Sequence, residues 1–121
     1  MKKVLVVDDS LEVIQNLRKL VEKIDGLTLV GSADNVNAAV TLFSSNKPDI
    51  IILDIGLTKG SGIEVLHQIK SLPAPATVIM FTNYSKDAFR KTSIKLGADY
   101  FLDKTHDFDR LIDILKEIAE K

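Results

Sequence analysis

Four consecutive apolar residues lie between two carboxylates in the stretch Asp49-Ile50-Ile51-Ile52-Leu53-Asp54. A run without polar alternation is typical of a strand that is buried on both faces, as in the middle of a parallel sheet. Pro48 interrupts the chain directly before this run, and Gly56 begins a glycine-containing loop after it. The stretch therefore predicts a central strand that ends at Asp54.

Similar apolar runs on both sides of this stretch predict four more strands. They cover residues 4–7, 28–33, 77–82 and 98–102. Between the runs, apolar residues recur at three- and four-residue steps, as on one face of a helix. These stripes run over residues 11–24, 36–43, 63–69, 86–96 and 108–118, and the fourth has the fewest apolar residues. Ser10 and either Asp34 or Asn35 are the expected N-caps of the first two helices.

The alternation of five strands with five helices predicts the fold class. Strands joined through helical crossovers form a parallel sheet with helices on both faces. We expect an α/β fold with a doubly wound, five-stranded parallel sheet in a (βα)5 arrangement. No linker or repeat divides the chain, so we expect one domain over residues 1–121.

Composition argues against several classes of function. The 121 residues carry a formal net charge of −1 and include no cysteine. Balanced charge gives no support for direct nucleic-acid binding. The lack of cysteine excludes disulfides and thiol catalysis and fits a reducing cytoplasm. The first apolar run is too short for a membrane span, which needs about 20 residues. We therefore expect a soluble cytoplasmic protein that binds neither nucleic acid nor membrane.

Polar residues follow the apolar runs where the predicted strands end. They are Asp8 and Asp9 after the first run, Asp54 after the third, Thr82 at the end of the fourth and Lys104 just beyond the fifth. Ligands of open α/β sheets bind at this carboxyl edge, near the point where the strand order reverses. We therefore expect three carboxylates, a hydroxyl and an ammonium to converge there.

Such a cluster has a definite chemistry. Crowded carboxylates repel one another, and their burial requires a cation. Lys104 supplies one positive charge, and Mg²⁺, or Mn²⁺ in its place, would supply two more through carboxylate and water ligands. One carboxylate can then act as a nucleophile and form an acyl phosphate. Each residue alone is compatible with a turn, a cap or a solvated surface, but their joint placement favours a phosphoryl-accepting site.

On these residues the sequence resembles the receiver domains of two-component response regulators over essentially its whole length. The matching features are the Asp8-Asp9 pair, Asp54 as phosphoacceptor, Gly62 eight residues later, Thr82, and Lys104 with Phe101 three residues before it. The resemblance implies a flavodoxin-like receiver fold and a signalling function in which the domain catalyses only its own phosphorylation and dephosphorylation.

The resemblance also implies a role for each acidic residue. Asp54 would be the nucleophile. Asp9, Asp54 and the backbone carbonyl of Gly56 would bind Mg²⁺, and Asp8 would act mostly through metal-bound water. Lys104 would pair with a phosphoryl oxygen.

Two further residues would transmit the signal. In the family, a hydroxyl residue at the position of Thr82 moves toward the phosphoryl group while an aromatic residue at the position of Phe101 swings inward. These shifts would alter the face formed by residues 86–96, 98–102 and 108–118. The implied partners are a sensor histidine kinase or a phosphotransfer protein as donor, and a downstream protein partner. A phosphorylation-linked homodimer stays open, and so does an effector domain in a longer protein.

Some positions depart from the usual family pattern. Many receivers have proline at the positions of Thr58 and Thr105, and alanine or glycine at that of Asn83. A non-proline cis bond costs about 2.5–4 kcal/mol, so we expect a trans bond before Thr105. Asn83 is large enough to shield the phosphoryl site in part, and Tyr84 and Gly56 are placed to govern water access to it.

Other functions on this fold fit the sequence less well. One alternative is a receiver-like interaction module that phosphorylation does not regulate, but all five site residues are present. A flavodoxin needs a Ser/Thr/Gly-rich phosphate loop where this chain has Asp8 and Asp9. A haloacid-dehalogenase-type phosphatase needs Asp-x-Asp, and Ser10 breaks that motif. P-loop and GxGxxG motifs are absent.

The expected helix over residues 86–96 has a basic face. We interpret it as solvated, with Asp87 and Lys91 paired at i,i+4. His67 and His106 are isolated from other ligand types in sequence, and we interpret them as surface residues.

Overall fold

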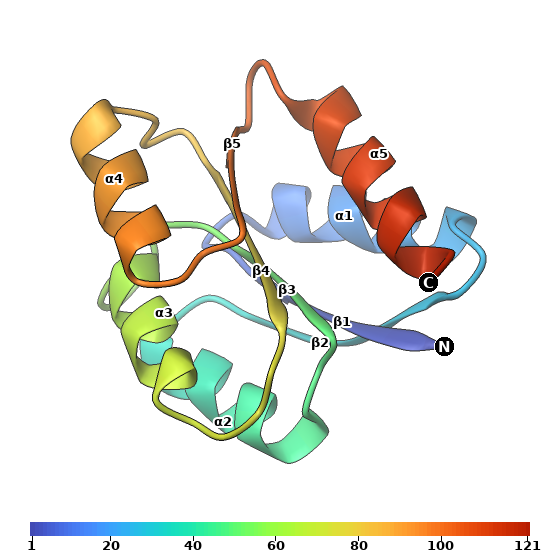
Figure 1. The fold of residues 1–121 in the computed structure, drawn as a ribbon, viewed down its shortest axis with the longest axis horizontal. Coiled ribbons are helices and arrows are strands. Elements are labelled where there is room, and N and C mark those ends of the chain that lie inside the picture. The colour runs from blue at the N-terminus through green and yellow to red at the C-terminus, as the bar shows by residue number, and fades with distance from the viewer.

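A computed structural model describes residues 1–121 and shows strands and helices in strict alternation (Figure 1). The strands are β1 (Lys2–Val7), β2 (Leu27–Ala33), β3 (Ile50–Leu53), β4 (Thr77–Thr82) and β5 (Tyr100–Asp103). The helices are α1 (Leu11–Lys23), α2 (Val36–Asn46), α3 (Gly62–Lys70), α4 (Asp87–Lys95) and α5 (Phe108–Ala119). The predicted order of elements is confirmed.

All strands pair in parallel in one sheet of order β2-β1-β3-β4-β5. Figure 1 shows α1 and α5 on one face of the sheet and α2, α3 and α4 on the other. This is the predicted doubly wound α/β fold. Because the chain runs outward from β1 to β2 and then returns to β3, the strand order reverses between β1 and β3. Ligand sites of this fold class lie at the carboxyl ends of those two strands.

The central strand β3 separates the two cores. All four of its residues are buried, as the unbroken apolar run predicts. Since successive side chains of a strand point to opposite faces, Ile50 and Ile52 pack beneath α1 and α5, while Ile51 and Leu53 pack beneath α2, α3 and α4. Burial on both faces holds β3 in place between the two layers of helices. It therefore also fixes the position of the residues that follow β3.

Short polar side chains fix the starts of the helices that follow β1 and β2. The hydroxyl of Ser10 accepts a hydrogen bond from the Val13 N–H at 3.3 Å. The side-chain oxygen of Asn35 accepts one from the Ala38 N–H at 2.9 Å. Ser10 is thus the predicted N-cap, and Asn35 is the cap of the second helix.

Two details differ from the sequence expectation. Leu11 belongs to the predicted apolar stripe but is 68% exposed, because the first turn of α1 begins at the rim where β1 has already ended. Asp87 and Lys91 form no ion pair. An exposed pair on a helix contributes only about 0.3–0.5 kcal/mol, too little to hold two long side chains together. None of the five helices has the length and apolar character that crossing a bilayer requires.

Candidate functional site

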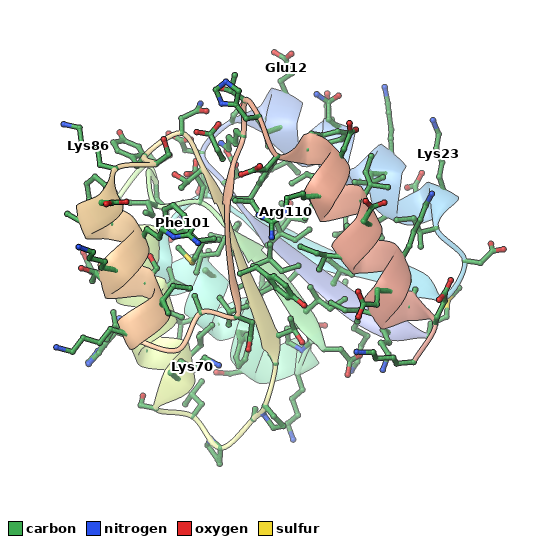
Figure 2. All side chains as sticks on the ribbon, turned by 45° about the horizontal axis from the view of Figure 1, so that its top comes forward. Glu12, Lys23, Lys70, Lys86, Phe101 and Arg110 are labelled. Atoms are coloured by element: carbon green, nitrogen blue, oxygen red, sulfur yellow. The ribbon has the colours of Figure 1, made fainter.

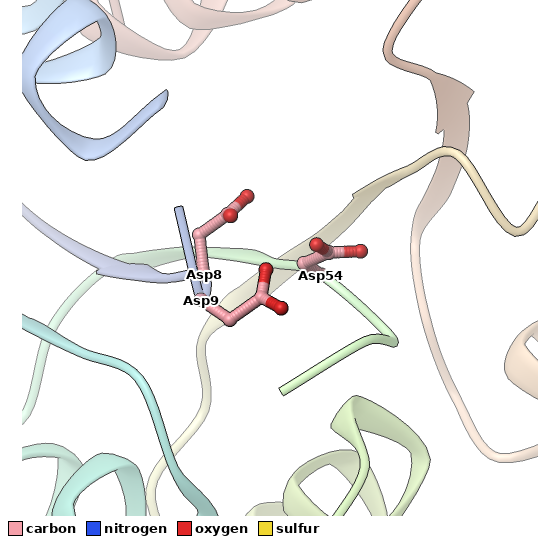
Figure 3. Close-up of side chains that lie close together, drawn as sticks. All are labelled: Asp8, Asp9 and Asp54. Atoms are coloured by element: carbon pink, nitrogen blue, oxygen red, sulfur yellow. The ribbon is translucent and has the colours of Figure 1, made fainter. Parts of the chain in front are cut away.

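Three carboxylates meet at the carboxyl edge of the sheet where the strand order reverses. Asp8 and Asp9 follow β1, and Asp54 follows β3. Figure 3 shows the three side chains beside one another, and one oxygen of each lies within 4.8 Å of the others. Asp8 is 2% exposed and Asp54 4%, whereas Asp9 is open to solvent. The three carboxylates that the sequence predicts at strand ends therefore lie together in the structure.

Lys104 reaches this cluster from the turn after β5. Its ammonium nitrogen lies 2.7 Å from Oδ2 of Asp8 and 2.9 Å from Oδ2 of Asp54. The backbone N–H of Lys104 donates to the carbonyl of Thr82 at 3.1 Å, which continues the β4–β5 pairing by one residue. One ammonium therefore faces two buried carboxylates.

The charges of the cluster are incompletely balanced. Burial raises the pKa of Asp8 above its usual value, although hydrogen bonds from Lys104 and from the Ser10 N–H act in the opposite direction. Burial alone would lower the pKa of Lys104, but its bonds to Asp8 and Asp54 outweigh burial and raise it. Three carboxylates against one ammonium leave an excess of negative charge. This oxygen-rich, anionic site suits a hard divalent cation.

The loop after β3 holds Asp54 from two sides. The Gly56 N–H donates to Oδ1 of Asp54 at 3.3 Å. The start of α3 packs so closely against the end of β3 that a Cβ on Gly62 would overlap the carbonyl oxygen of Asp54. The Gly62 N–H donates to the carbonyl of Ile55 at 2.8 Å. Only glycine fits position 62 without moving the backbone that carries Asp54.

Thr82 ends the neighbouring strand β4, and Tyr84 lies in the loop that follows it. Thr82 is fully buried at the end of β4, and its hydroxyl accepts a hydrogen bond from the Tyr84 N–H at 3.1 Å. The ring of Tyr84 lies against Gly56, where a Cβ would come within 2.6 Å of its Cε2 atom. The same ring meets Phe89 of α4 edge-on, with centroids 5.8 Å apart. Tyr84 therefore links the loop beside Asp54 to α4.

Phe101 lies on the face of the sheet that α4 covers (Figure 2). It is buried, and the guanidinium carbon of Arg90 lies 6.0 Å from its ring centroid. Arg90 also donates to the carbonyl of Phe101 at 3.4 Å. The residue predicted as a switch thus joins β5 to α4 by both stacking and a hydrogen bond.

Two of the positions that depart from the family pattern, Asn83 and Thr105, lie next to each other in the loops after β4 and β5. The chain contains no cis peptide bond, so the bond before Thr105 is trans as predicted. The Thr105 hydroxyl lies 3.4 Å from the side-chain oxygen of Asn83, which brings two of the departures together. Asp103 and Asp107 were not among the predicted site residues, but their carboxylates accept hydrogen bonds from backbone N–H groups in and next to the turn that carries Lys104. Their only signal was the general tendency of aspartate to form turns.

The comparisons with known proteins agree with this geometry. The sequence profile of the response regulator receiver domain matches residues 4–116. The chain belongs to this family. A receiver domain is a signalling domain of two-component systems, and its phosphorylation-dependent switching fits the site described above.

Individual relatives of this receiver domain support the assignment. It is 36% identical to the transcriptional regulatory protein YdfI of Bacillus subtilis over 99% of its own length, but it spans only 63% of that relative. The signal receiver domain of a DNA-binding response regulator from Colwellia psychrerythraea superposes with a TM-score of 0.90 at 27% identity, with both chains fully covered. CheY in a CheX–CheY–BeF3–Mg complex from Borrelia burgdorferi superposes with a TM-score of 0.87 at 27% identity. The match covers 97% of this chain and 88% of that one.

Replacing Asp8 with asparagine should raise the melting temperature of the metal-free receiver domain at neutral pH. The raised pKa of Asp8 means that its ionised form costs folding free energy, and asparagine of the same shape removes that cost. The cost is absent below the unfolded-state pKa of 3.8 and appears as the pH rises through the folded-state pKa. The difference between the proteins should therefore disappear on acidification.

Thermal melts in EDTA at several pH values check this expectation, and Mg²⁺ should stabilise the Asp8→Asn variant less than the wild type. Asp113→Asn removes the same charge from an exposed site on α5 and serves as control. A lower melting temperature for Asp8→Asn than for the control at neutral pH would contradict the argument.

Proposed function

We propose that this receiver domain, residues 1–121, accepts a phosphoryl group on Asp54 in a Mg²⁺-dependent reaction and thereby switches a protein-interaction surface. One observation carries the proposal. The carboxylates of Asp8, Asp9 and Asp54 converge within 4.8 Å while Lys104 bonds to two of them. The surface that switches is formed by α4, β5 and α5.

The residues present fit a hard divalent cation. Asp9 is exposed and makes no hydrogen bond through its side chain, so its carboxylate is free to bind a metal together with Asp54 and the carbonyl of Gly56. Asp8 already pairs with Lys104 and would act through metal-bound water. A bound Mg²⁺ or Mn²⁺ would neutralise charge on the carboxylates and on the incoming phosphoryl group.

The transfer step needs little beyond positioning and charge. An oxygen of Asp54 attacks phosphorus, the new O–P bond forms, and the P–N bond to the donor histidine breaks with its electron pair going to the leaving nitrogen. The ammonium of Lys104, 2.9 Å from Oδ2 of Asp54, lies where it can pair with an oxygen of the transferred group.

The same residues connect the site to the switch surface. We propose that the Thr82 hydroxyl, which now accepts from the Tyr84 N–H, donates to a phosphoryl oxygen after transfer. Its movement would release the loop that leads to α4. That helix has a single fully buried residue, Ser93, whose hydroxyl has no partner, so little packing opposes a rearrangement. Phe101 and Arg90 would carry the change to β5.

Water access would set the lifetime of the acyl phosphate. The Tyr84 ring lies against Gly56, two residues from Asp54, and the exposed Asn83 precedes Tyr84 in the same loop. We propose that these side chains slow hydrolysis by shielding the phosphorylated carboxyl group.

The proposed partners follow from the family. A sensor histidine kinase or a phosphotransfer protein would supply the phosphoryl group, and a downstream protein partner would read the switched surface in the cytoplasm. The Borrelia complex supports the second idea, since a similar domain is bound there to CheX with BeF3 and Mg²⁺. A phosphorylation-linked homodimer would use the same surface.

Intact mass after incubation with a small acyl-phosphate donor tests the proposal. With Mg²⁺ the protein should gain the mass of one phosphoryl group, and with EDTA it should gain none, because without a cation the anionic site repels the donor. If the protein gains no mass in Mg²⁺ at any donor concentration, the proposal fails. The remaining explanation is then a receiver-like interaction module that phosphorylation does not regulate.

A further inference from the structure

The turn that carries Lys104 is closed by two carboxylates that the proposed reaction does not use. Asp103 ends β5, and its Oδ1 atom accepts hydrogen bonds from the N–H groups of Thr105 at 2.7 Å and His106 at 3.2 Å. Asp107 precedes α5, and its Oδ2 atom accepts from the Asp103 N–H at 2.8 Å. The Asp107 N–H donates in return to the Asp103 carbonyl at 2.9 Å. The turn is therefore tied from both ends.

Asp107 directly precedes α5 but does not cap it with its side chain. An aspartate directly before a helix normally caps it by accepting a hydrogen bond from an N–H of the first turn. Ser10 and Asn35 do so in α1 and α2, whereas the side chain of Asp107 makes no such bond in α5 and points back to Asp103. This carboxylate is thus committed to the turn.

Asp103 is ionised at neutral pH. The hydrogen bond from the Thr105 N–H, and then the side chain of Ser85, hold its pKa below the usual value. Ser85 belongs to the loop after β4, so Asp103 also lies where the loop of Thr82 meets the turn of Lys104.

The shape of this turn fixes the position of the Lys104 backbone and the direction in which its side chain leaves it. Lys104 lies between the two tied residues, and the chain changes direction directly after it. A lysine side chain has many rotamers, so a small displacement of its backbone moves the ammonium away from Asp8 and Asp54 or spreads it over several positions. Ammonium-to-oxygen distances of 2.7 and 2.9 Å leave little tolerance.

We propose that Asp103 and Asp107 are positioning residues, which hold the turn in the shape that presents the Lys104 ammonium to the phosphoacceptor Asp54. The idea rests on the proposed function of Asp54. At the position of Thr105 many receivers have a proline, whose ring stiffens the chain. Here the Thr105 N–H is available and bonds to Asp103 instead, so a carboxylate takes over the stiffening.

Substitutions at Asp103 separate this role from a purely structural one. Asp103→Ala removes the acceptor, while Asp103→Asn keeps a side-chain oxygen for the same two N–H groups. Asp109→Ala is the control, since Asp109 is exposed in the first turn of α5 and makes no bond to the turn. Initial rates of phosphorylation are measured on the full chain over a series of acyl-phosphate concentrations at fixed Mg²⁺.

Asp103→Ala should lower the maximum rate about tenfold or more, as expected for a displaced charge at a reacting centre. The half-saturating donor concentration should stay unchanged. Asp103→Asn and Asp109→Ala should keep nearly the wild-type rate. If Asp103→Ala does not fold, Asp107→Ala, which removes only the bond to the Asp103 N–H, must show the loss of maximum rate.

A second readout does not depend on phosphorylation. The side-chain ¹⁵N signal of Lys104 and the hydrogen exchange of the Thr105 and His106 amides should change in Asp103→Ala and stay unchanged in Asp103→Asn. If the wild type shows these signals but is never phosphorylated, the proposed function fails and the positioning role stands. An unchanged rate and Lys104 signal in Asp103→Ala, or an Asp103→Asn variant as slow as Asp103→Ala, would overturn the proposal.

Discussion

Replacing Asp54 with asparagine should abolish the Mg²⁺-dependent gain of a phosphoryl group from a small acyl-phosphate donor. The asparagine amide lacks the negative charge that makes the carboxylate a nucleophile. It also removes one of three charges that would hold the cation. The fold should persist, because the asparagine oxygen can still accept from the Gly56 N–H and Lys104 keeps its bond to Asp8.

Asp49→Asn is the matched control for this variant. Asp49 precedes the same strand, β3, at the opposite edge of the sheet, and it is exposed. Its asparagine variant should be phosphorylated at the wild-type rate. Intact mass at several times of incubation measures both proteins. Wild-type phosphorylation of Asp54→Asn would show that another residue is the acceptor.

Replacing Gly62 with alanine should give the largest loss of stability among single-methyl additions at the chain's glycines. The added Cβ would overlap the Asp54 carbonyl oxygen and lie 2.7 Å from the carbon of that carbonyl and 2.9 Å from the Cα of Ile55. These are backbone atoms, so α3 or the end of β3 must move. We expect a loss of about 3 kcal/mol in the free energy of unfolding. That loss corresponds to a melting temperature lower by about 10 °C.

Gly31→Ala provides the comparison, because the nearest atoms to its new Cβ are side-chain carbons of Leu42 and Leu5 at 3.5–3.7 Å, an ordinary contact distance. Denaturant titration of both variants measures the difference. A Gly62→Ala protein as stable as Gly31→Ala would mean that α3 can withdraw from Asp54 at little cost.

The order of the elements could be predicted because buried positions of strands and helices recur at regular spacings of apolar residues in the sequence. The unbroken run Ile50–Leu53 indicated a strand buried on both faces, and the structure confirms it. Periodicity does not show where a helix passes beyond the sheet. Leu11 therefore fits the apolar stripe of α1 and is nevertheless exposed. Either Asp34 or Asn35 fitted the cap before α2, and only the backbone geometry selects Asn35.

The convergence of the site residues was predictable for a similar reason. Residues that directly follow parallel strands must meet at one edge, so Asp8, Asp54 and Lys104 were expected to lie together. Sequence could not tell which carboxylates Lys104 would contact, because that depends on strand stagger and on the turn after β5. The bonds of Asp103 and Asp107 were missed because they depend on which N–H groups face each carboxylate, and spacing does not show this.

Peptide mapping tests the central claim most directly. The wild-type domain is incubated with a small acyl-phosphate donor and Mg²⁺, the labile acyl phosphate is trapped by chemical reduction, and the digested peptides are sequenced by mass spectrometry. The structure predicts a single modified residue, Asp54, in Mg²⁺ and none in EDTA. Modification of His67, His106 or a hydroxyl residue with Asp54 unchanged would contradict the account.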